Sequence, residues 1–232
     1  MICVSIAQPD ISRIEAILKR VTPYADLAEI RLDALSDYEA DMRPLSAASP
    51  LPLLWTNRPE WEGGRFKGSE DERIEILKRA VRAGAAYVDI ELATDPAARS
   101  SLVDDAKAKG TRVILSFHDL SGTPPMERLL AILEGMAEAG ADVGKIVTTA
   151  RDNRDVARLF ALYEPAHELG LALTAFSMGE RGRLSRLACL AAGAPITYAA
   201  PFPGSETAPG QIPAEDLHEF VEYFSSTSKG AP

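Results

Sequence analysis

The sequence predicts an α/β fold, a single (β/α)8 barrel, and three observations lead to it. Short β-branched or apolar runs alternate with longer helical patterns from one end of the chain to the other. Eight such repeats fill 232 residues, the length of one barrel domain. Glycines stand where helices end, just before the next strand. A doubly wound open sheet has the same alternation and is the alternative fold.

We expect strands near residues 2–7, 27–33, 51–58, 86–92, 111–118, 143–149, 171–178 and 195–202, each followed by one helix. The third helix shows its period clearly, because Ile74, Leu77 and Val81 line one face and Gly84 follows the last turn. No linker or compositional break divides the chain. We therefore expect one barrel domain over residues 1–224 and a flexible carboxyl-terminal tail over residues 225–232.

The composition of the chain excludes several classes of binding partner. A net charge of -9 and a pI near 5.0, without a basic block, argue against nucleic acid and anionic membranes and favour a small-molecule substrate. Cys3 and Cys189 form neither a disulfide framework nor a metal-ligand spacing, so we expect reduced, packed thiols and no metal. The amino terminus does not resemble a secretion signal, and no apolar run is long enough for a bilayer. These features predict a cytoplasmic protein.

Polar and apolar side chains alternate along five of the predicted strands. In residues 27–33, Ala28, Ile30 and Leu32 alternate with Glu29, Arg31 and Asp33. The apolar set should face the helices, which places the polar set inside the barrel. The same alternation sends inward Thr56, Arg58, Asp89, Glu91, Ser116, His118 and Lys145. Burying each charge costs several kcal/mol, so charges near the carboxyl ends of the strands predict an active site rather than packing.

Lys145 and His118 are the candidate reacting groups. Lys145 lies within a strand-like run, where loss of water would lower the pKa of an amine and favour Schiff-base chemistry on a carbonyl. The alternative is a lysine that snorkels to solvent or pairs with a carboxylate. His118 ends the preceding predicted strand, and the ordinary pKa of a histidine suits proton transfer near neutral pH. His167 and His218 fall in amphipathic helices and should lie at the surface.

Three loops add further candidates. Residues 56–66 carry Arg58 and Glu62, with two glycines that let the backbone fold over the barrel mouth. Residues 177–186 contain Arg186, whose guanidinium could bind a substrate carboxylate. Residues 207–213 form either part of the site or a rigid turn in which Gln211 only caps.

The motifs together resemble the type I 3-dehydroquinate dehydratase (3-dehydroquinase) family over essentially the whole chain. They are Glu29-Ile30-Arg31-Leu32-Asp33, Arg58-Pro59-Glu60-Trp61-Glu62-Gly63-Gly64, Ser116-Phe117-His118-Asp119, Lys145, Ser177-Met178-Gly179 with Ser185-Arg186, and Ala208-Pro209-Gly210-Gln211. The resemblance implies a Schiff-base lyase of the shikimate pathway and aromatic amino acid biosynthesis, without a cofactor. It also implies a (β/α)8 barrel that dimerises, here lacking the amino-terminal hairpin of longer members.

The resemblance also implies roles for individual residues. Lys145 forms an imine with the C3 ketone of 3-dehydroquinate, His118 moves the C2 proton to the departing C1 hydroxyl, and Glu62 orients His118. The substrate-binding set is Arg186 and Gln211 at the carboxylate, Glu29, Arg31 and Arg58 at ring hydroxyls, Phe176 and Met178 as an apolar wall, and Ser5 and Thr207. From the inward pattern alone, Asp89 and Glu91 balance the arginines.

Three positions depart from the family pattern. Thr207 stands where serine is common, and Tyr198-Ala199 replaces Phe-Gly, which we place after the eighth strand.

Two other functions fit some of the same residues. A class I aldolase also needs a barrel lysine, although the carboxylate-side and hydroxyl-binding residues suit a cyclic polyol acid better than a sugar phosphate. A metabolite-binding barrel without turnover is the other, which intact Lys145, His118 and Glu62 disfavour.

Overall fold

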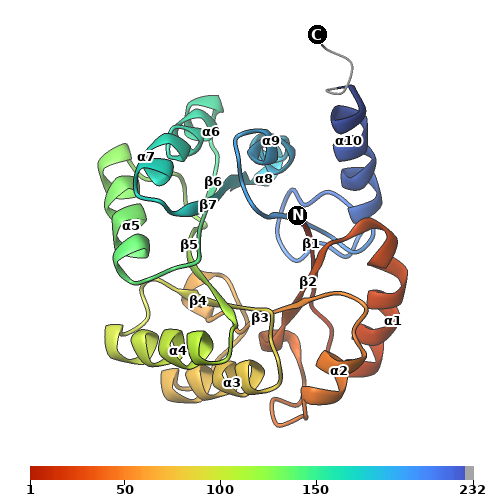
Figure 1. The fold of residues 1–232 in the computed structure, drawn as a ribbon. Helices are drawn as coiled ribbons and strands as arrows, with labels where there is room; N and C mark the ends of the chain where they lie inside the picture. Colours follow the sequence, from red (N-terminus) through yellow and green to blue (C-terminus); the bar gives the residue numbers. More distant parts are fainter. Residues whose placement is uncertain (228–232) are drawn as a thin grey trace.

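A ring of eight parallel strands lies inside a ring of helices in the computed structural model, which describes residues 1–227 (Figure 1). Neighbours in the ring follow chain order, and β1 also pairs with β8. Between β7 and β8 the Thr174 hydroxyl donates to the Ile196 carbonyl at 2.9 Å. The predicted barrel is confirmed, and the open sheet is wrong. The strands are β1 Ile2–Ile6, β2 Leu27–Arg31, β3 Leu53–Thr56, β4 Tyr87–Glu91, β5 Arg112–Asp119, β6 Val143–Thr149, β7 Ala172–Met178 and β8 Thr197–Ala199.

One helix after each strand was expected, and this is wrong after β6 and β7, where two helices follow. Pro165 has no amide hydrogen and cannot sit in the middle of a continuous helix, so α6 ends before α7 begins. Gly182 ends α8, where an added Cβ would lie 2.5 Å from Ser177. The helices are α1 Ile11–Val21, α2 Arg43–Ala48, α3 Glu70–Arg82, α4 Pro96–Ala108, α5 Met126–Glu138, α6 Asn153–Phe160, α7 Tyr163–Glu168, α8 Gly179–Gly182, α9 Ser185–Ala191 and α10 Ala214–Thr227.

Local signals fix the ends of α3. Ser69 and Glu72 form a reciprocal capping box at its amino end. The predicted face of Ile74, Leu77 and Val81 is buried, as expected. Gly84 follows with φ of +92°, a conformation that side chains with a Cβ rarely adopt, so the chain leaves the helix there and enters β4.

Several predicted strands extend beyond the strands of the structure at their carboxyl ends. β2 stops at Arg31 because residues Leu32–Ala34 form a 3-10 turn, η2, so Asp33 is not a strand residue. β3 stops at Thr56, and Arg58 lies in the following loop. Tyr198 and Ala199 belong to β8 itself rather than to the loop after it.

Strand alternation builds three inward layers across β2 to β6, as the strand period requires. The lowest layer is apolar and closes the amino end of the barrel: Leu27, Leu54, Tyr87, Ile114 and Val143. The middle layer is polar: Glu29, Thr56, Asp89, Ser116 and Lys145. The third layer lies at the carboxyl ends: Arg31, Arg58, Glu91, His118 and Val147. Outward side chains such as Ile30 and Ile90 pack against the helices in the main core.

The remaining expectations concern two histidines, two cysteines, membrane spans and the carboxyl terminus. His167 is exposed and His218 is half-buried on α10. Cys3 and Cys189 are buried and unbonded. Within residues 1–227, none of the helices combines the length and the apolar character that crossing a membrane requires. α10 continues to Thr227, beyond the expected start of the tail at residue 225, and residues 228–232 lie outside the described part.

Candidate active site

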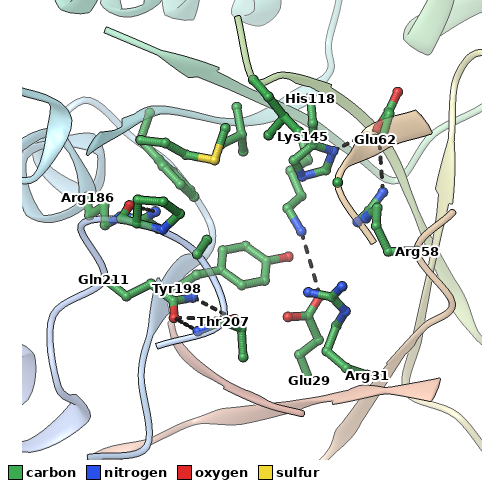
Figure 2. A pocket seen from close by; sticks show the side chains of 17 residues that line it. Glu29, Arg31, Arg58, Glu62, His118, Lys145, Arg186, Tyr198, Thr207 and Gln211 are labelled. Atoms are coloured by element: carbon green, nitrogen blue, oxygen red, sulfur yellow. Dashed lines mark hydrogen bonds and ion pairs between the residues drawn. The ribbon is translucent and has the colours of Figure 1, made fainter. Parts of the chain in front are cut away.

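A pocket opens at the carboxyl ends of the strands, where the charged layers meet the loops (Figure 2). Every side chain expected to act in catalysis or substrate binding lines it except that of Ser5. The lining members of that set are Glu29, Arg31, Arg58, Glu62, His118, Lys145, Phe176, Met178, Arg186, Thr207 and Gln211. Ser5 lies beside the pocket and donates to Glu29.

Lys145 lies in the middle polar layer and is almost fully buried, with 4% of the residue exposed. Its Nζ donates to Asp89 at 3.0 Å and lies 3.8 Å from Glu29. The ring of Tyr198 covers the amine, with its centroid 4.0 Å from Nζ. The side chain therefore does not snorkel to bulk solvent. An amine that pairs with carboxylates and also faces a pocket is fixed in position for attack on a carbonyl carbon.

His118 and Glu62 form a buried pair beside Lys145. His118 Nδ1 lies 2.8 Å from Glu62 Oε2, and the register of β5 on β6 places His118 one inward layer above Lys145. Burial, with the nearby charges of Arg58 and Lys145, holds the pKa of His118 well below its ordinary value. Burial raises the pKa of Glu62 to about 8, although Arg58 acts in the opposite direction. The imidazole is therefore uncharged at neutral pH, and its Nε2 can accept a proton once the Glu62 carboxyl group has lost its own.

Two glycines allow the loop after β3 to carry Glu62 over the barrel mouth. Glu60–Glu62 form a 3-10 turn, η3, that ends at Gly63 with φ of +79°. An added Cβ at Gly64 would lie 1.9 Å from the carbonyl oxygen of Arg58. Only glycine fits where the backbone approaches itself this closely. Glycine placement in the sequence thus sets the position of a site carboxyl group.

Alternating charges connect Lys145 to the helix layer. Asp89 pairs with Lys145 and with Arg58, whose guanidinium lies 2.8 Å away. Arg58 also pairs with Glu91, and Glu91 pairs in turn with Arg73 of α3. Burial alone would raise the pKa of Asp89, but the positive charges of Arg58 and Lys145 hold it well below its ordinary value. The expectation that Asp89 and Glu91 balance arginines agrees with these ion pairs.

Arg31 and Asp33 tie the second strand to the loop after the third. Arg31 donates to both oxygens of Asp33, at 2.8 and 2.7 Å. Asp33 also accepts from the amides of Arg58 at 3.2 Å and Arg65 at 3.0 Å. Asp33 therefore does not point into the pocket as a strand residue would; instead it holds Arg31 at the rim and fixes the loop that carries Glu62.

Arg186 is a buried cation for which the described residues provide no ion pair. Only 1% of the residue is exposed, its Nε has no hydrogen-bond partner, and an Nη donates to the Pro209 carbonyl at 3.2 Å. Burial lowers its pKa to about 10. The guanidinium lies 4.6 Å from the ring centroid of Phe176, which with Met178 forms an apolar wall. An uncommitted guanidinium in a pocket is suited to bind a carboxylate through two hydrogen bonds.

The loop after β8 is held by its own side chains. Gln211 Oε1 accepts from the Thr207 amide at 2.7 Å, and Gln211 Nε2 donates to the Thr207 hydroxyl at 3.1 Å. Thr207 donates to Ser5 at 2.9 Å. At Gly210 an added Cβ would lie 2.7 Å from the Gly179 carbonyl oxygen, so the loops after β7 and β8 touch. Gln211 caps a turn and also lines the pocket, which satisfies both expectations.

Two residues of the site were missed in the sequence. Tyr198 lines the pocket, and its inward direction could have been inferred from its two-residue spacing from Ile196 within the strand predicted near residues 195–202. Arg73 is fully buried on α3, where it precedes Leu77 by four residues and therefore lies on the apolar face. An arginine on such a face, opposite the predicted inward carboxylates, was the available signal.

Carboxylates in the pocket and directly beneath it form ion pairs with cations of the chain itself. Glu29, Asp89 and Glu91 each pair with lysine or arginine. Among residues 1–227, no three side chains of the metal-ligating types stand together as ligands.

Comparisons with known proteins agree with this geometry. The family model for Type I 3-dehydroquinase matches residues 2–228. A 3-dehydroquinate dehydratase from Desulfotalea psychrophila is 41% identical over 217 residues, covering 93% of this chain and 94% of that protein. One from Thermococcus gammatolerans is 40% identical over 207 residues, covering 89% of this chain and 92% of that protein.

Solved structures are similar as well. The 3-dehydroquinate dehydratase from Geobacillus kaustophilus superposes with a TM-score of 0.88 at 28% identity, covering 97% of this chain and 91% of that one. The type I enzyme from Clostridium difficile, crystallised with covalent modified comenic acid, superposes with a TM-score of 0.88 at 27% identity over 97% and 92% of the two chains.

Proposed function

The chain belongs to the type I 3-dehydroquinase family, and we propose that Lys145, His118 and Glu62 carry its reaction. Its activity is the dehydration of 3-dehydroquinate to 3-dehydroshikimate, a hydro-lyase reaction of the shikimate pathway that proceeds through a Schiff base. The observation that carries the assignment of residues is the buried Lys145 amine, directed into a pocket beside an uncharged imidazole.

Imine formation begins at Lys145. The amine gives up a proton and its nitrogen attacks the C3 ketone, forming a carbon–nitrogen bond while the carbonyl electron pair moves to oxygen. Protonation of that oxygen gives a carbinolamine, and loss of water gives the iminium ion. His118 lies beside Lys145 with a lowered pKa, so it can accept and return these protons.

Elimination follows from the electron sink at C3. The iminium ion acidifies the C2 proton, which His118 removes to give an enamine. The enamine electrons expel the C1 hydroxyl, which takes the proton from His118 and leaves as water. Hydrolysis then releases the unsaturated ketone and restores the amine. Glu62, 2.8 Å from Nδ1, orients the ring, and its ionised form stabilises the charged imidazole during transfer.

Substrate binding divides between the two sides of the pocket. Arg186 has no carboxylate partner among the described residues, so it binds the carboxylate of the substrate, with Gln211 beside it. Glu29, Arg31 and Arg58 line the opposite side, where the ring hydroxyls bind, as Figure 2 makes visible. Phe176 and Met178 contact the ring carbons. Thr207 and Ser5 fix the loop that closes this side.

We also propose that the enzyme works as a homodimer in the cytoplasm. The family resemblance supports the dimer, and the exposed Leu184 on the helix layer, 76% exposed, offers apolar surface for a second copy. The two buried, unbonded cysteines support a reducing compartment. With one barrel domain over residues 1–224, each copy holds a complete pocket.

Borohydride trapping tests the assignment. Incubation with 3-dehydroquinate and sodium borohydride should reduce the imine and leave a covalent adduct on Lys145, which peptide mass spectrometry locates. Lys145→Ala should lose both the adduct and turnover, whereas His118→Ala should lose turnover but still accumulate imine. Full activity in the lysine variant would contradict the covalent route. An adduct on another lysine would reassign the nucleophile.

A further inference from the structure

The hydroxyl of Tyr198 is buried without a hydrogen-bond partner. Tyr198 is 3% exposed, its ring lines the pocket, and no described residue bonds its hydroxyl oxygen. A buried polar group without a partner destabilises the folded state, so such groups are rare and call for an explanation. Phenylalanine would fill the same space without this cost. The hydroxyl therefore points to a partner that arrives with the substrate.

The surroundings of Tyr198 indicate which part of the site this partner occupies. The ring centroid lies 4.0 Å from Lys145 Nζ. Figure 2 shows the hydroxyl directed away from Arg186 and Gln211 and toward the space between the Lys145 amine and Glu29. Burial, with the negative charge of Glu29, raises the pKa of Tyr198 well above its ordinary value. The hydroxyl thus keeps its proton and is available as a donor.

The two arginines on this side of the pocket are already paired with carboxylates of the chain. Arg31 donates to both oxygens of Asp33. Arg58 pairs with Asp89 and Glu91. Arg186, another pocket residue with an unpartnered buried polar atom, lies away from the Tyr198 hydroxyl. Tyr198 therefore offers a donor that no described residue occupies to an oxygen that gains negative charge next to Lys145 Nζ.

We propose that Tyr198 is a further catalytic residue, whose hydroxyl donates a hydrogen bond to the substrate oxygen on the carbon that Lys145 attacks. This inference rests on the proposed function. As the nitrogen–carbon bond forms, the carbonyl electron pair moves to that oxygen, and the O–H of Tyr198 stabilises the charge. The oxygen then takes a proton, becomes the carbinolamine hydroxyl and leaves as water. Tyr198 keeps its own proton throughout, so the step needs no further reactant.

The Tyr198→Phe variant isolates the hydroxyl, because the ring and its contact with Lys145 remain. The rate of borohydride-trapped adduct formation is measured in a single turnover, together with kcat, KM and the thermal unfolding midpoint. We expect adduct formation and kcat to fall about ten- to hundredfold, as for loss of one donor to a developing negative charge. KM should change less than twofold, and the unfolding midpoint should stay equal or rise because an unpaired buried group is removed.

Tyr163→Phe is the matched control. Tyr163 is also partly buried, but its hydroxyl donates to the Ala175 carbonyl at 3.0 Å and accepts from the Ala175 amide at 3.0 Å, and the residue does not line the active-site pocket. Removing that hydroxyl should lower the unfolding midpoint and leave the adduct rate within about twofold of wild type. Tyr198→Phe should therefore slow adduct formation without loss of stability, and Tyr163→Phe should lower stability without slowing adduct formation.

The outcomes separate the two proposals. Rates are measured well below the unfolding midpoint, so altered stability does not imitate a slower reaction. An adduct that forms at the wild-type rate in Tyr198→Phe overturns the role of the hydroxyl, whatever the midpoint does. A wild-type protein that forms no adduct on Lys145 overturns the proposed function instead. Slower adduct formation at unchanged KM supports Tyr198.

Discussion

Replacing Glu62 with glutamine removes a titrating group from the buried pair that it forms with His118. Glu62 is 6% exposed and lies 2.8 Å from Nδ1 of His118. Because burial raises the pKa of Glu62 to about 8, its carboxyl group keeps a proton at neutral pH. Above about pH 8, the carboxylate accepts a hydrogen bond from the Nδ1–H group, so the proton of the neutral ring stays on Nδ1 and the Nε2 lone pair is free for the substrate. We expect kcat of the wild type to rise as the pH passes through about 8.

The same pKa has a consequence for stability. The folded-state pKa of Glu62, about 8, lies above the ordinary value of 4.5. The stability that the protonated group contributes is therefore fully present below about pH 4.5 and is lost as the pH rises to about 8. At about 1.4 kcal/mol per pKa unit, this loss amounts to about 4 kcal/mol between pH 5 and pH 9. Glutamine avoids the loss but gives up the attraction to Arg58, 3.7 Å away. At pH 9 we therefore expect Glu62→Gln to have a free energy of unfolding about 2 to 4 kcal/mol higher than that of the wild type.

Urea unfolding at pH 5 and pH 9, with initial-rate pH profiles, measures both effects. Glu62→Gln should lower kcat by roughly 10²-fold and remove the rise near pH 8, because the amide neither titrates nor stabilises a charged imidazole. Glu60→Gln is the matched control, since Glu60 is exposed in the same 3-10 turn and should change neither property. If Glu62→Gln keeps the rise near pH 8, or changes stability equally at both pH values, the assignment of this titration to Glu62 is refuted.

Two further substitutions test the charges around the site. Arg186→Gln removes the buried cation that lacks a carboxylate partner, so kcat/KM should fall by about 10²- to 10³-fold in steady-state assays, whereas the exposed control Arg181→Gln should retain wild-type values. Arg73→Met leaves Glu91 with one cation instead of two and should lower the free energy of unfolding in urea by about 3 to 5 kcal/mol, unlike the exposed control Arg82→Met on the same helix. Arg186→Gln with unchanged KM, or Arg73→Met with wild-type stability, would contradict these assignments.

The inward layers could be predicted because a strand has a fixed side-chain period of two. Once Ile30 was placed against the helices, Glu29 and Arg31 had to face the barrel interior, and the structure places both at the pocket. The same period located Lys145 and His118 on neighbouring strands. Strand position and direction are local properties, which is why one sequence sufficed for them.

Strand ends were harder to predict, because they depend on contacts made elsewhere. Asp33 continues the alternation of β2, yet the strand stops at Arg31. The amides of Arg58 and Arg65, from the loop after β3, donate to the Asp33 carboxylate and hold it in the 3-10 turn. Nothing within residues 27–33 encodes those donors. The predicted strand near residues 195–202 contains Tyr198, and only the end of that strand differs, because β8 pairs with β1 from Thr197 to Ala199.

Pairing between charges also decides which side chains remain for the substrate. Lys145, Asp89, Arg58, Glu91 and Arg73 alternate in sign, and each inner member has an opposite charge on both sides. These groups are satisfied in the substrate-free protein and serve mainly to fix the amine in place.

The unpaired hydrogen-bond donors of the pocket determine which ligands it selects. Arg186 and Tyr198 line the pocket with polar atoms that no described residue satisfies, and the Tyr198 hydroxyl is directed away from Arg186 (Figure 2). A ligand that offers a carboxylate to one and a ketone oxygen to the other would satisfy both at once. Buried groups left unpaired penalise any ligand that lacks either oxygen, so they discriminate more strongly than apolar contacts do. The selectivity for a keto acid therefore resides in the two donors that the barrel leaves without partners, while the four charges paired in series with Lys145 position the nucleophile.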